Sequence, residues 1–131
     1  PLIRSMNVRD GEFSEAGLAF LDSQQAAKLN NVTVQANDVL LNITGASVAR
    51  VCLAPPHMEG ARVNQHVSII RLSKSMTSEF LEAFLLMPRT KGKLLMIAES
   101  GATRQAITKA QIEELCDLDG AASRCEPANH R

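Results

Sequence analysis

The chain contains no tryptophan and no tyrosine, and its four phenylalanines make up only 3% of its 131 residues. A hydrophobic core must therefore be built from Leu, Ile, Val, Met and Ala. No apolar run approaches the roughly 18 to 20 residues of a membrane span, and no signal peptide opens the chain. We therefore expect no membrane partner. The length is typical of a single domain.

Cysteine is also scarce, and catalytic motifs are missing. Cys52, Cys116 and Cys125 are an odd number without Cys-x-x-Cys spacing, which favours a reduced, cytoplasmic compartment. The sequence has no Walker loop, no His-Glu-x-x-His and no Gly-x-Ser-x-Gly motif. We expect no catalytic residue, no metal and no cofactor. The enzymatic alternative is a small hydrolase with Cys52 as nucleophile beside His57 or His66.

The chain has no net charge, since its 14 basic residues match its 14 acidic ones. This balance argues against a protein that coats nucleic acid non-specifically. The charges are unevenly distributed, however. Residues 88–109 hold five basic residues against one acidic residue, a local charge of +4. A local basic patch is more informative about a binding site than the total.

Strand patterns lie before residue 73 and helix patterns after it, which predicts an α+β fold with a twisted, mostly antiparallel sheet. Apolar and β-branched residues bounded by turn residues indicate the strands. The predicted strands are Leu2–Val8, Leu18–Leu21, Asp38–Ile43, Val48–Leu53 and Val63–Leu72. An Asp10-Gly11 turn follows the first of them.

Capping residues mark the predicted helices. The helices run from Asp22, with Gln25 completing a capping box, to Leu29; from Thr77 or Ser78 to Met87; from Lys91 to Glu99; and from Thr108, with Gln111, to Leu115. Residues Phe80, Leu81, Phe84, Leu85, Leu94, Leu95 and Ile97 are expected to be buried. The domain should cover residues 1–117, followed by a polar, poorly ordered tail over residues 118–131.

Five stretches follow one another in an order that is specific as a set. They are "PLIRSMNVRDGEF", "VQANDVLLNITGASVARV", "ARVNQHVSIIRL", "SEFLEAFLL" and "SGATRQAITKAQIEEL". The series covers roughly residues 1–115 and resembles the target recognition domain of type I restriction–modification DNA specificity subunits. The resemblance implies that domain's fold and sequence-specific binding of double-stranded DNA. It also implies that methyl transfer and cleavage belong to separate methyltransferase and nuclease subunits, so the chain itself would not be an enzyme.

Two features depart from the family pattern. The family usually has glycine where Ala49 stands. The long helices that form its coiled coil, which spaces two recognition domains and docks the methyltransferase subunits, are replaced here by "CDLDGAASRCEPANHR". We therefore expect a single, isolated recognition domain.

Candidate DNA-contacting residues combine short donors and acceptors with basic side chains. Asn and Gln can bind adenine through two hydrogen bonds, and Arg can bind guanine in the same way. Hydroxyl groups and backbone N–H groups near a flexible glycine can bind phosphate. The candidates are Asn42, Thr44, Gly45, Ser47 and Arg50 around the predicted hairpin loop; Asn64, Gln65 and His66 at a strand start; Arg89, Lys91 and Lys93 in the basic segment; and Thr103, Arg104 and Gln105 before the last helix.

Each candidate group also has an ordinary structural explanation. The loop can be a plain surface hairpin, Asn64 to His66 can be a strand start at the rim of the sheet, and the basic residues can form a solvated face. The rival function is a protein-interaction or self-association module, such as a homodimer, derived from a recognition domain and without DNA binding. The zero net charge and the missing coiled coil favour this rival.

Overall fold

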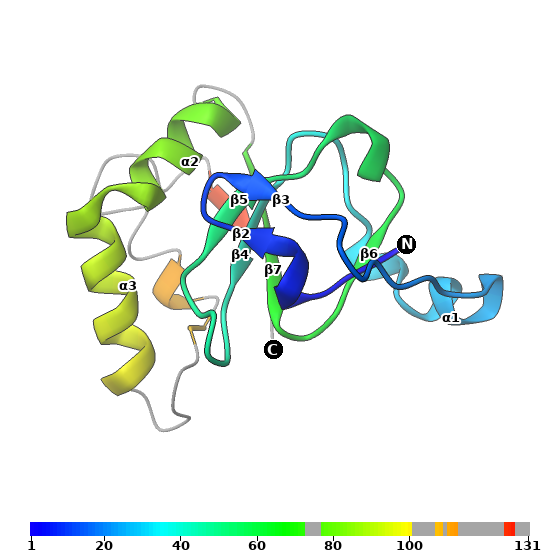
Figure 1. The fold of residues 1–131 in the computed structure, drawn as a ribbon, viewed down its shortest axis with the longest axis horizontal. Helices are drawn as coiled ribbons and strands as arrows, with labels where there is room; N and C mark the ends of the chain where they lie inside the picture. The colour runs from blue at the N-terminus through cyan, green and yellow to red at the C-terminus, as the bar shows by residue number, and fades with distance from the viewer. Residues whose placement is uncertain (73–76, 101–106, 109, 113–124, 128–131) are drawn as a thin grey trace.

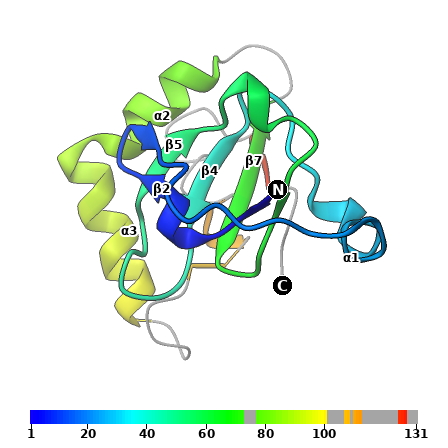
Figure 2. The ribbon, with the colours of Figure 1, turned by 45° about the vertical axis from the view of Figure 1, so that its right-hand side comes forward.

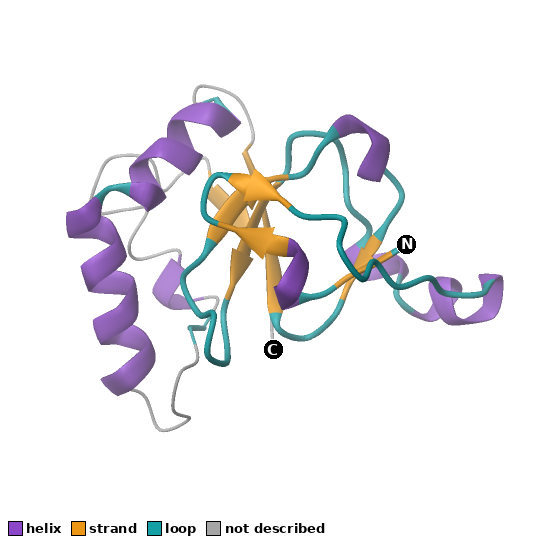
Figure 3. Ribbon diagram, in the orientation of Figure 1, coloured by secondary structure: helices purple, strands orange, loops and turns teal. Residues whose placement is uncertain are grey.

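The computed structural model describes residues 1–72, 77–100, 107–108, 110–112 and 125–127 (Figure 1). Its strands are β1 (Leu2–Ile3), β2 (Val8–Arg9), β3 (Glu12–Phe13), β4 (Val39–Asn42), β5 (Val51–Leu53), β6 (Arg62–Val63), β7 (Val67–Leu72) and β8 (Cys125–Pro127). Its helices are α1 (Ser23–Lys28), α2 (Ser78–Leu86) and α3 (Pro88–Ser100), with short 3-10 turns η1 (Ser5–Asn7), η2 (Asn30–Val32) and η3 (Pro56–Met58). The predicted α+β class is confirmed (Figure 3).

The main sheet has the strand order β5-β4-β7-β8, and every neighbouring pair in it is antiparallel. Strand β4 lies inside the sheet, and all four of its residues are buried. Leu40 on β4 pairs with Cys52 on β5 and with Ile69 on β7. Two small pairs flank this sheet: the antiparallel hairpin β2–β3 and the parallel pair β1–β6.

The two faces of β4 support two separate hydrophobic cores. Val39 and Leu41 pack with α2 and α3 in one cluster, whereas Leu40 packs with residues of the N-terminal segment in the other. This division follows the alternation of side chains along a strand. In Figure 2, α2 and α3 lie on one side of the sheet and α1 lies toward the other. A central strand buried on both faces explains the continuous apolar run of the sequence.

The three helix starts predicted from capping residues are confirmed, because caps depend on residues close in sequence. The Gln25 N–H donates to Asp22 Oδ1 at 2.7 Å, and the Asp22 N–H donates to Gln25 Oε1 at 3.1 Å. The same reciprocal bonds join Thr108 and Gln111, and residues 110–112 are helical. The hydroxyl of Thr77 accepts the Phe80 N–H at the start of α2.

Four predicted strands differ from the structure by more than one residue. The predicted strand Val48–Leu53 begins only at Val51, because Val48 and Ala49 lie in a turn. Residues Leu2–Val8 are interrupted by η1, because Asn7 Oδ1 accepts the Arg4 N–H at 3.0 Å while its Nδ2 donates to two backbone carbonyls. Leu18–Leu21 forms only an isolated bridge through Ala19. Val63–Leu72 splits into β6 and β7, since Asn64 Oδ1 accepts the His66 N–H at 3.0 Å and turns the chain.

The helical region differs in three details. Helix α3 begins at Pro88 rather than Lys91, because proline is well tolerated in the first helical turn, where no N–H is needed. Phe80 and Leu95 are 60% and 41% exposed instead of buried. The core side of these helices is set by Leu81, Leu85, Leu94 and Ala98, and Phe80 and Leu95 point about 100° away from their buried neighbours.

Within the predicted tail, Cys125–Pro127 forms β8 along the β7 edge of the sheet. Residues 118–124 and 128–131 of that tail lie outside the described residues. A segment can pair with a sheet edge through backbone hydrogen bonds alone. The polar side chains of the tail therefore did not predict this pairing.

An ion pair with a buried carboxylate joins the start of β4 to β7. Asp38 is only 3% exposed, and its two oxygens lie 2.9 and 2.8 Å from Nε and Nη2 of Arg71. Asp38 Oδ2 also accepts the Gln35 N–H at 2.8 Å, and Arg71 Nη2 donates to the Thr33 carbonyl at 3.1 Å. The pair therefore orders the turn that leads into the central strand.

We expect Asp38→Ala to lower the free energy of unfolding by about 2 kcal/mol, because it removes the hydrogen bonds that a buried carboxylate accepts from Arg71 and from the Gln35 N–H. Glu15→Ala is the matched control. Glu15 pairs with His57, and both side chains are more than half exposed, so its loss should cost less than about 1 kcal/mol. Urea denaturation of both variants measures the difference. Equal losses would contradict the role assigned to Asp38.

Candidate nucleic-acid interface

The loop between β4 and β5 lies beside the turn before β7. Because β4 and β7 are antiparallel, Asn42 pairs with Val67, and the residues just beyond this pair meet. The Ile43 N–H donates to the His66 carbonyl at 3.0 Å, and Thr44 Oγ1 is hydrogen-bonded to His66 Nδ1. Two of the four groups proposed from sequence therefore adjoin each other at one end of the sheet.

A third segment reaches the same place. The Ile107 N–H donates to the carbonyl of Ile43 at 2.7 Å, so the chain that enters the last helix passes along the start of the loop. Ile107 itself is buried in the core next to α2 and α3. The candidates Thr103, Arg104 and Gln105 stand two to four positions before Ile107 but lie outside the described residues.

The tips of these segments are open. Gly45, Arg50 and Gln65 are exposed, whereas Thr44, Ser47, Asn64 and His66 are half-buried. Gly45 has a φ of +85°, and a side chain placed on it would meet no heavy atom within 4 Å. The glycine is therefore needed for its backbone conformation and not for lack of space.

The hydrogen bond between Thr44 and His66 fixes the position of two polar side chains at once. It uses one ring nitrogen of His66, and the second, Nε2, can donate or accept according to the tautomer. The Thr44 oxygen also keeps hydrogen-bonding capacity beyond this bond. The pair thus offers a held hydroxyl and a held imidazole nitrogen at the end of the sheet.

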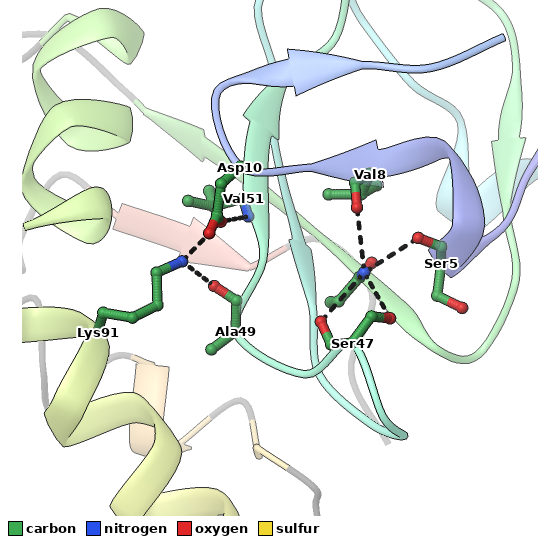
Figure 4. A network of polar contacts seen from close by, with 8 residues as sticks. Ser5, Val8, Asp10, Ser47, Ala49, Val51 and Lys91 are labelled. Atoms are coloured by element: carbon green, nitrogen blue, oxygen red, sulfur yellow. Dashed lines mark hydrogen bonds and ion pairs between the residues drawn. The ribbon is translucent and has the colours of Figure 1, made fainter. Parts of the chain in front are cut away.

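Asn42 was predicted to contact DNA, and the structure corrects this. Asn42 is fully buried. Its Nδ2 donates to the Ser5 carbonyl and to Ser47 Oγ, both at 3.0 Å, and lies 3.4 Å from the Val8 carbonyl (Figure 4). A polar group buried in this way satisfies backbone acceptors. Asn42 therefore joins η1, β2 and the hairpin loop, and cannot reach a base edge.

Lys91 was predicted to contact phosphate, and the structure assigns its ammonium group to internal partners instead. Nζ lies 2.7 Å from Asp10 Oδ1 and also donates to the Ala49 carbonyl (Figure 4). The side chain is only 20% exposed. Arg89 and Lys93 are exposed on the same helix. Through Lys91, the first turn of α3 lies beside the β2–β3 hairpin, so these two residues are not at the loop tip.

Sequence reasoning missed two residues that shape the loop. Ala49 is buried and has a φ of +77°, a left-handed conformation that favours glycine. The signal was available, since the resemblance expected from the sequence implies a glycine at this position. Asp10 was recognised only as a turn residue, yet its carboxylate accepts the Val51 N–H at 3.2 Å and holds Lys91. No local pattern marks that role.

Comparisons with known proteins add no family assignment: no protein-family model matches the chain, and no curated protein matches it. None of the helices in the described part of the chain has the length and apolarity that a membrane crossing needs. Within the same ranges, no group of three or more His, Cys, Asp or Glu side chains is arranged to hold a metal ion.

Cys52, the nucleophile of the enzymatic alternative, lies in the buried face of β5. The pKa of its thiol is raised from 9.0 to about 12, mainly by burial and in smaller part by the carboxylates of Glu82 and Asp10. His57 is bound to Glu15 and His66 to Thr44, and neither is hydrogen-bonded to Cys52. An un-ionised thiol without an adjacent base is a poor nucleophile.

We expect Cys52 to be inert toward a thiol reagent such as 5,5′-dithiobis(2-nitrobenzoate) at pH 8. The experiment uses the Cys116→Ser, Cys125→Ser double variant, so that Cys52 is the thiol observed. Reaction should occur only after unfolding in urea. Because the folded state holds the proton more tightly, stability should also decrease as the pH rises from about 9 toward 12. Rapid labelling of the folded protein would reopen the hydrolase alternative.

Proposed function

We propose that this chain is a target-recognition-like domain that reads double-stranded DNA as the specificity element of a type I restriction–modification system. It carries no catalysis of its own and would act with methyltransferase and nuclease subunits. One observation carries the proposal. The β4–β5 loop, the Asn64–His66 turn and Ile107, which all belong to stretches that carry the family resemblance, meet at one end of the sheet.

Base recognition requires donors and acceptors that are held in place, because a mobile side chain loses entropy on binding and discriminates poorly. Thr44 and His66 are held by each other, and Asn64 is held by the His66 N–H. The β4–β5 loop and the Asn64–His66 turn are directly connected to the buried strands β4 and β7. The exposed Gln65 stands between these fixed side chains and can bind a base edge.

The backbone of the loop also supports the proposal. Ala49 adopts the left-handed conformation at the position where the family usually has glycine. An alanine in this region costs roughly 1–2 kcal/mol relative to a right-handed one. Although Ala49 carries this cost, the loop keeps the left-handed backbone. It therefore has the backbone shape expected of a loop with glycine at this position.

Phosphate contacts would come from the exposed basic residues. Arg50 lies at the loop exit, and Arg89 and Lys93 lie on α3. A few such contacts set the orientation of a protein on the duplex without reading sequence. So small a number of phosphate contacts is consistent with a chain that has no net charge.

We expect a selection from randomised duplexes to enrich a defined sequence. The affinity for that sequence should fall with salt by about 0.9 log units per phosphate contact for each log unit of salt, a slope of about −2 to −4 in total. Electrophoretic mobility shifts between 50 and 300 mM salt measure the slope. If no sequence is enriched and no duplex is bound at low salt, the proposal is wrong.

Gly45→Val should reduce binding to the selected duplex by at least about tenfold, because a β-branched residue cannot easily keep a left-handed φ. Gly60→Val is the matched control. Gly60 has a φ of +90° and equally open surroundings, and its N–H binds Val34 near the opposite end of β4. Both variants should lose similar stability, whereas only Gly45→Val should lose affinity for the selected duplex. Equal DNA affinity of the two would remove the loop from the interface.

The second candidate function is a protein-interaction or self-association module, and exposed apolar side chains favour it. Phe80, Met87 and Met96 in the α2–α3 region are 60%, 50% and 70% exposed. Such a module would enrich no duplex, and its association would depend weakly on salt. Sedimentation equilibrium over the same salt range, with Phe80→Ser as the altered variant, separates this function from DNA reading.

A further inference from the structure

The exit of the β4–β5 loop is held from outside the hairpin. Lys91 Nζ on α3 donates to the Ala49 carbonyl and pairs with Asp10 at 2.7 Å. Asp10 Oδ1 also accepts the Val51 N–H, and the Gly11 N–H donates to the Val51 carbonyl at 2.8 Å. Figure 4 shows Asp10, Ala49, Val51 and Lys91 converging from the β2–β3 turn, the loop exit, β5 and α3.

This contact acts where the backbone needs support. The Ala49 N–H donates to the Asn42 carbonyl at 2.8 Å, and its own carbonyl accepts from Lys91. An L-residue in the left-handed region persists only when its surroundings hold it there. With the Lys91 bond removed, one of the two backbone restraints on Ala49 is lost, and the loop exit can relax.

The start of the loop is held in a corresponding way. Asn42 Nδ2 binds both the carbonyl at 3.3 Å and the hydroxyl of Ser47 at 3.0 Å, and it anchors them to Ser5. The loop therefore has one polar anchor on the N-terminal side of the sheet and one on the helical side. Between them lie Thr44 and Gly45, the residues proposed to face DNA.

We propose that Lys91 is a positioning residue: with Asp10, it holds the loop exit at Ala49 and so sets the geometry with which the loop reads base edges. This inference rests on the proposed function for its DNA consequence, but the restraint itself exists in the free protein. A direct phosphate contact is a poor alternative for Lys91. Its charge is already neutralised by Asp10, and its side chain is largely buried, so little counterion release would result.

The first experiment needs no DNA. Amide hydrogen exchange is measured by NMR in Lys91→Met, which keeps most of the stem, and in Lys93→Met as the exposed control on the same helix. In Lys91→Met the loop amides of Val48, Ala49 and Arg50 should exchange about tenfold faster, as expected for one lost charged hydrogen bond. The β4–β7 amides of Leu40 and Ile69 should not change.

A uniform acceleration of loop and sheet amides would mean that Lys91 only adds global stability, and it would overturn the proposal. Unchanged loop exchange would overturn it as well. Asp10→Asn is a milder variant, because the amide oxygen can still accept from Val51 and Lys91 while the charge is lost. It should give an intermediate acceleration, and it keeps the proposal testable if Lys91→Met does not fold.

The second experiment compares the affinities of the selected duplex and of its single-base variants. Lys91→Met should lower the affinity ratio about fivefold to tenfold and leave the salt slope unchanged. Lys93→Met, which removes a proposed phosphate contact, should instead keep the ratio and reduce the salt slope by about 0.9. Lys91→Arg, which can donate to both partners, should recover much of the discrimination. A salt slope reduced by about 0.9 in Lys91→Met would identify a phosphate contact instead.

The two experiments separate two kinds of failure. If the wild-type protein binds no duplex, the proposed function is wrong, while the exchange measurement still decides whether Lys91 restrains the loop. If the protein binds DNA but Lys91→Met retains full discrimination, the positioning role is wrong and the proposed function stands.

Discussion

The hydrogen-bonded register between β4 and β7 is the constraint on which the candidate site depends. Asn42 lies opposite Val67, and this pairing brings Thr44 next to His66. A slip by one residue would turn every side chain of β4 to the other face. Because the two faces of β4 pack into separate cores, such a slip would exchange side chains between the cores. It would also turn Asn42 away from Ser5 and toward the helices, and the register is therefore strongly specified.

Polar contacts then connect this framework to its loops. Asp38 and Arg71 order the turn before β4, Asn42 ties the loop start to η1, and Lys91 with Asp10 holds the loop exit. Each contact uses a side chain that is at least partly buried, where an unpaired polar group is costly. These contacts hold the two ends of the hairpin loop against both layers of the protein, and leave its tip open.

Under the proposed function, different residues would carry different parts of DNA binding. The cores and polar anchors supply rigidity, the polar tips at one end of the sheet would supply recognition, and a few exposed basic residues would supply phosphate contacts. Rigidity and recognition are linked at Ala49, whose strained backbone lies between the tip and α3. A change on α3 can therefore alter the loop without contacting DNA.

Features that depend on neighbours in sequence were determined by the sequence. The caps at Asp22, Thr77 and Thr108 join residues three positions apart, and all three were predicted correctly. The continuous apolar run of β4 likewise predicted a buried strand. The interruptions at Asn7 and Asn64 were missed, since a short amide side chain competes with strand hydrogen bonds only when its acceptors are in reach.

Only the tertiary structure decided which polar residues remain free for a ligand. Asn42 and Lys91 look like recognition and phosphate residues in the sequence, yet their partners Ser5 and Asp10 lie 37 and 81 positions away. Folding brought these groups together, and burial made their pairing obligatory. The sequence determined the central strand, the capped helix starts and the polar character of the loop. Long-range packing decided which polar atoms of the loop face inward and which face solvent.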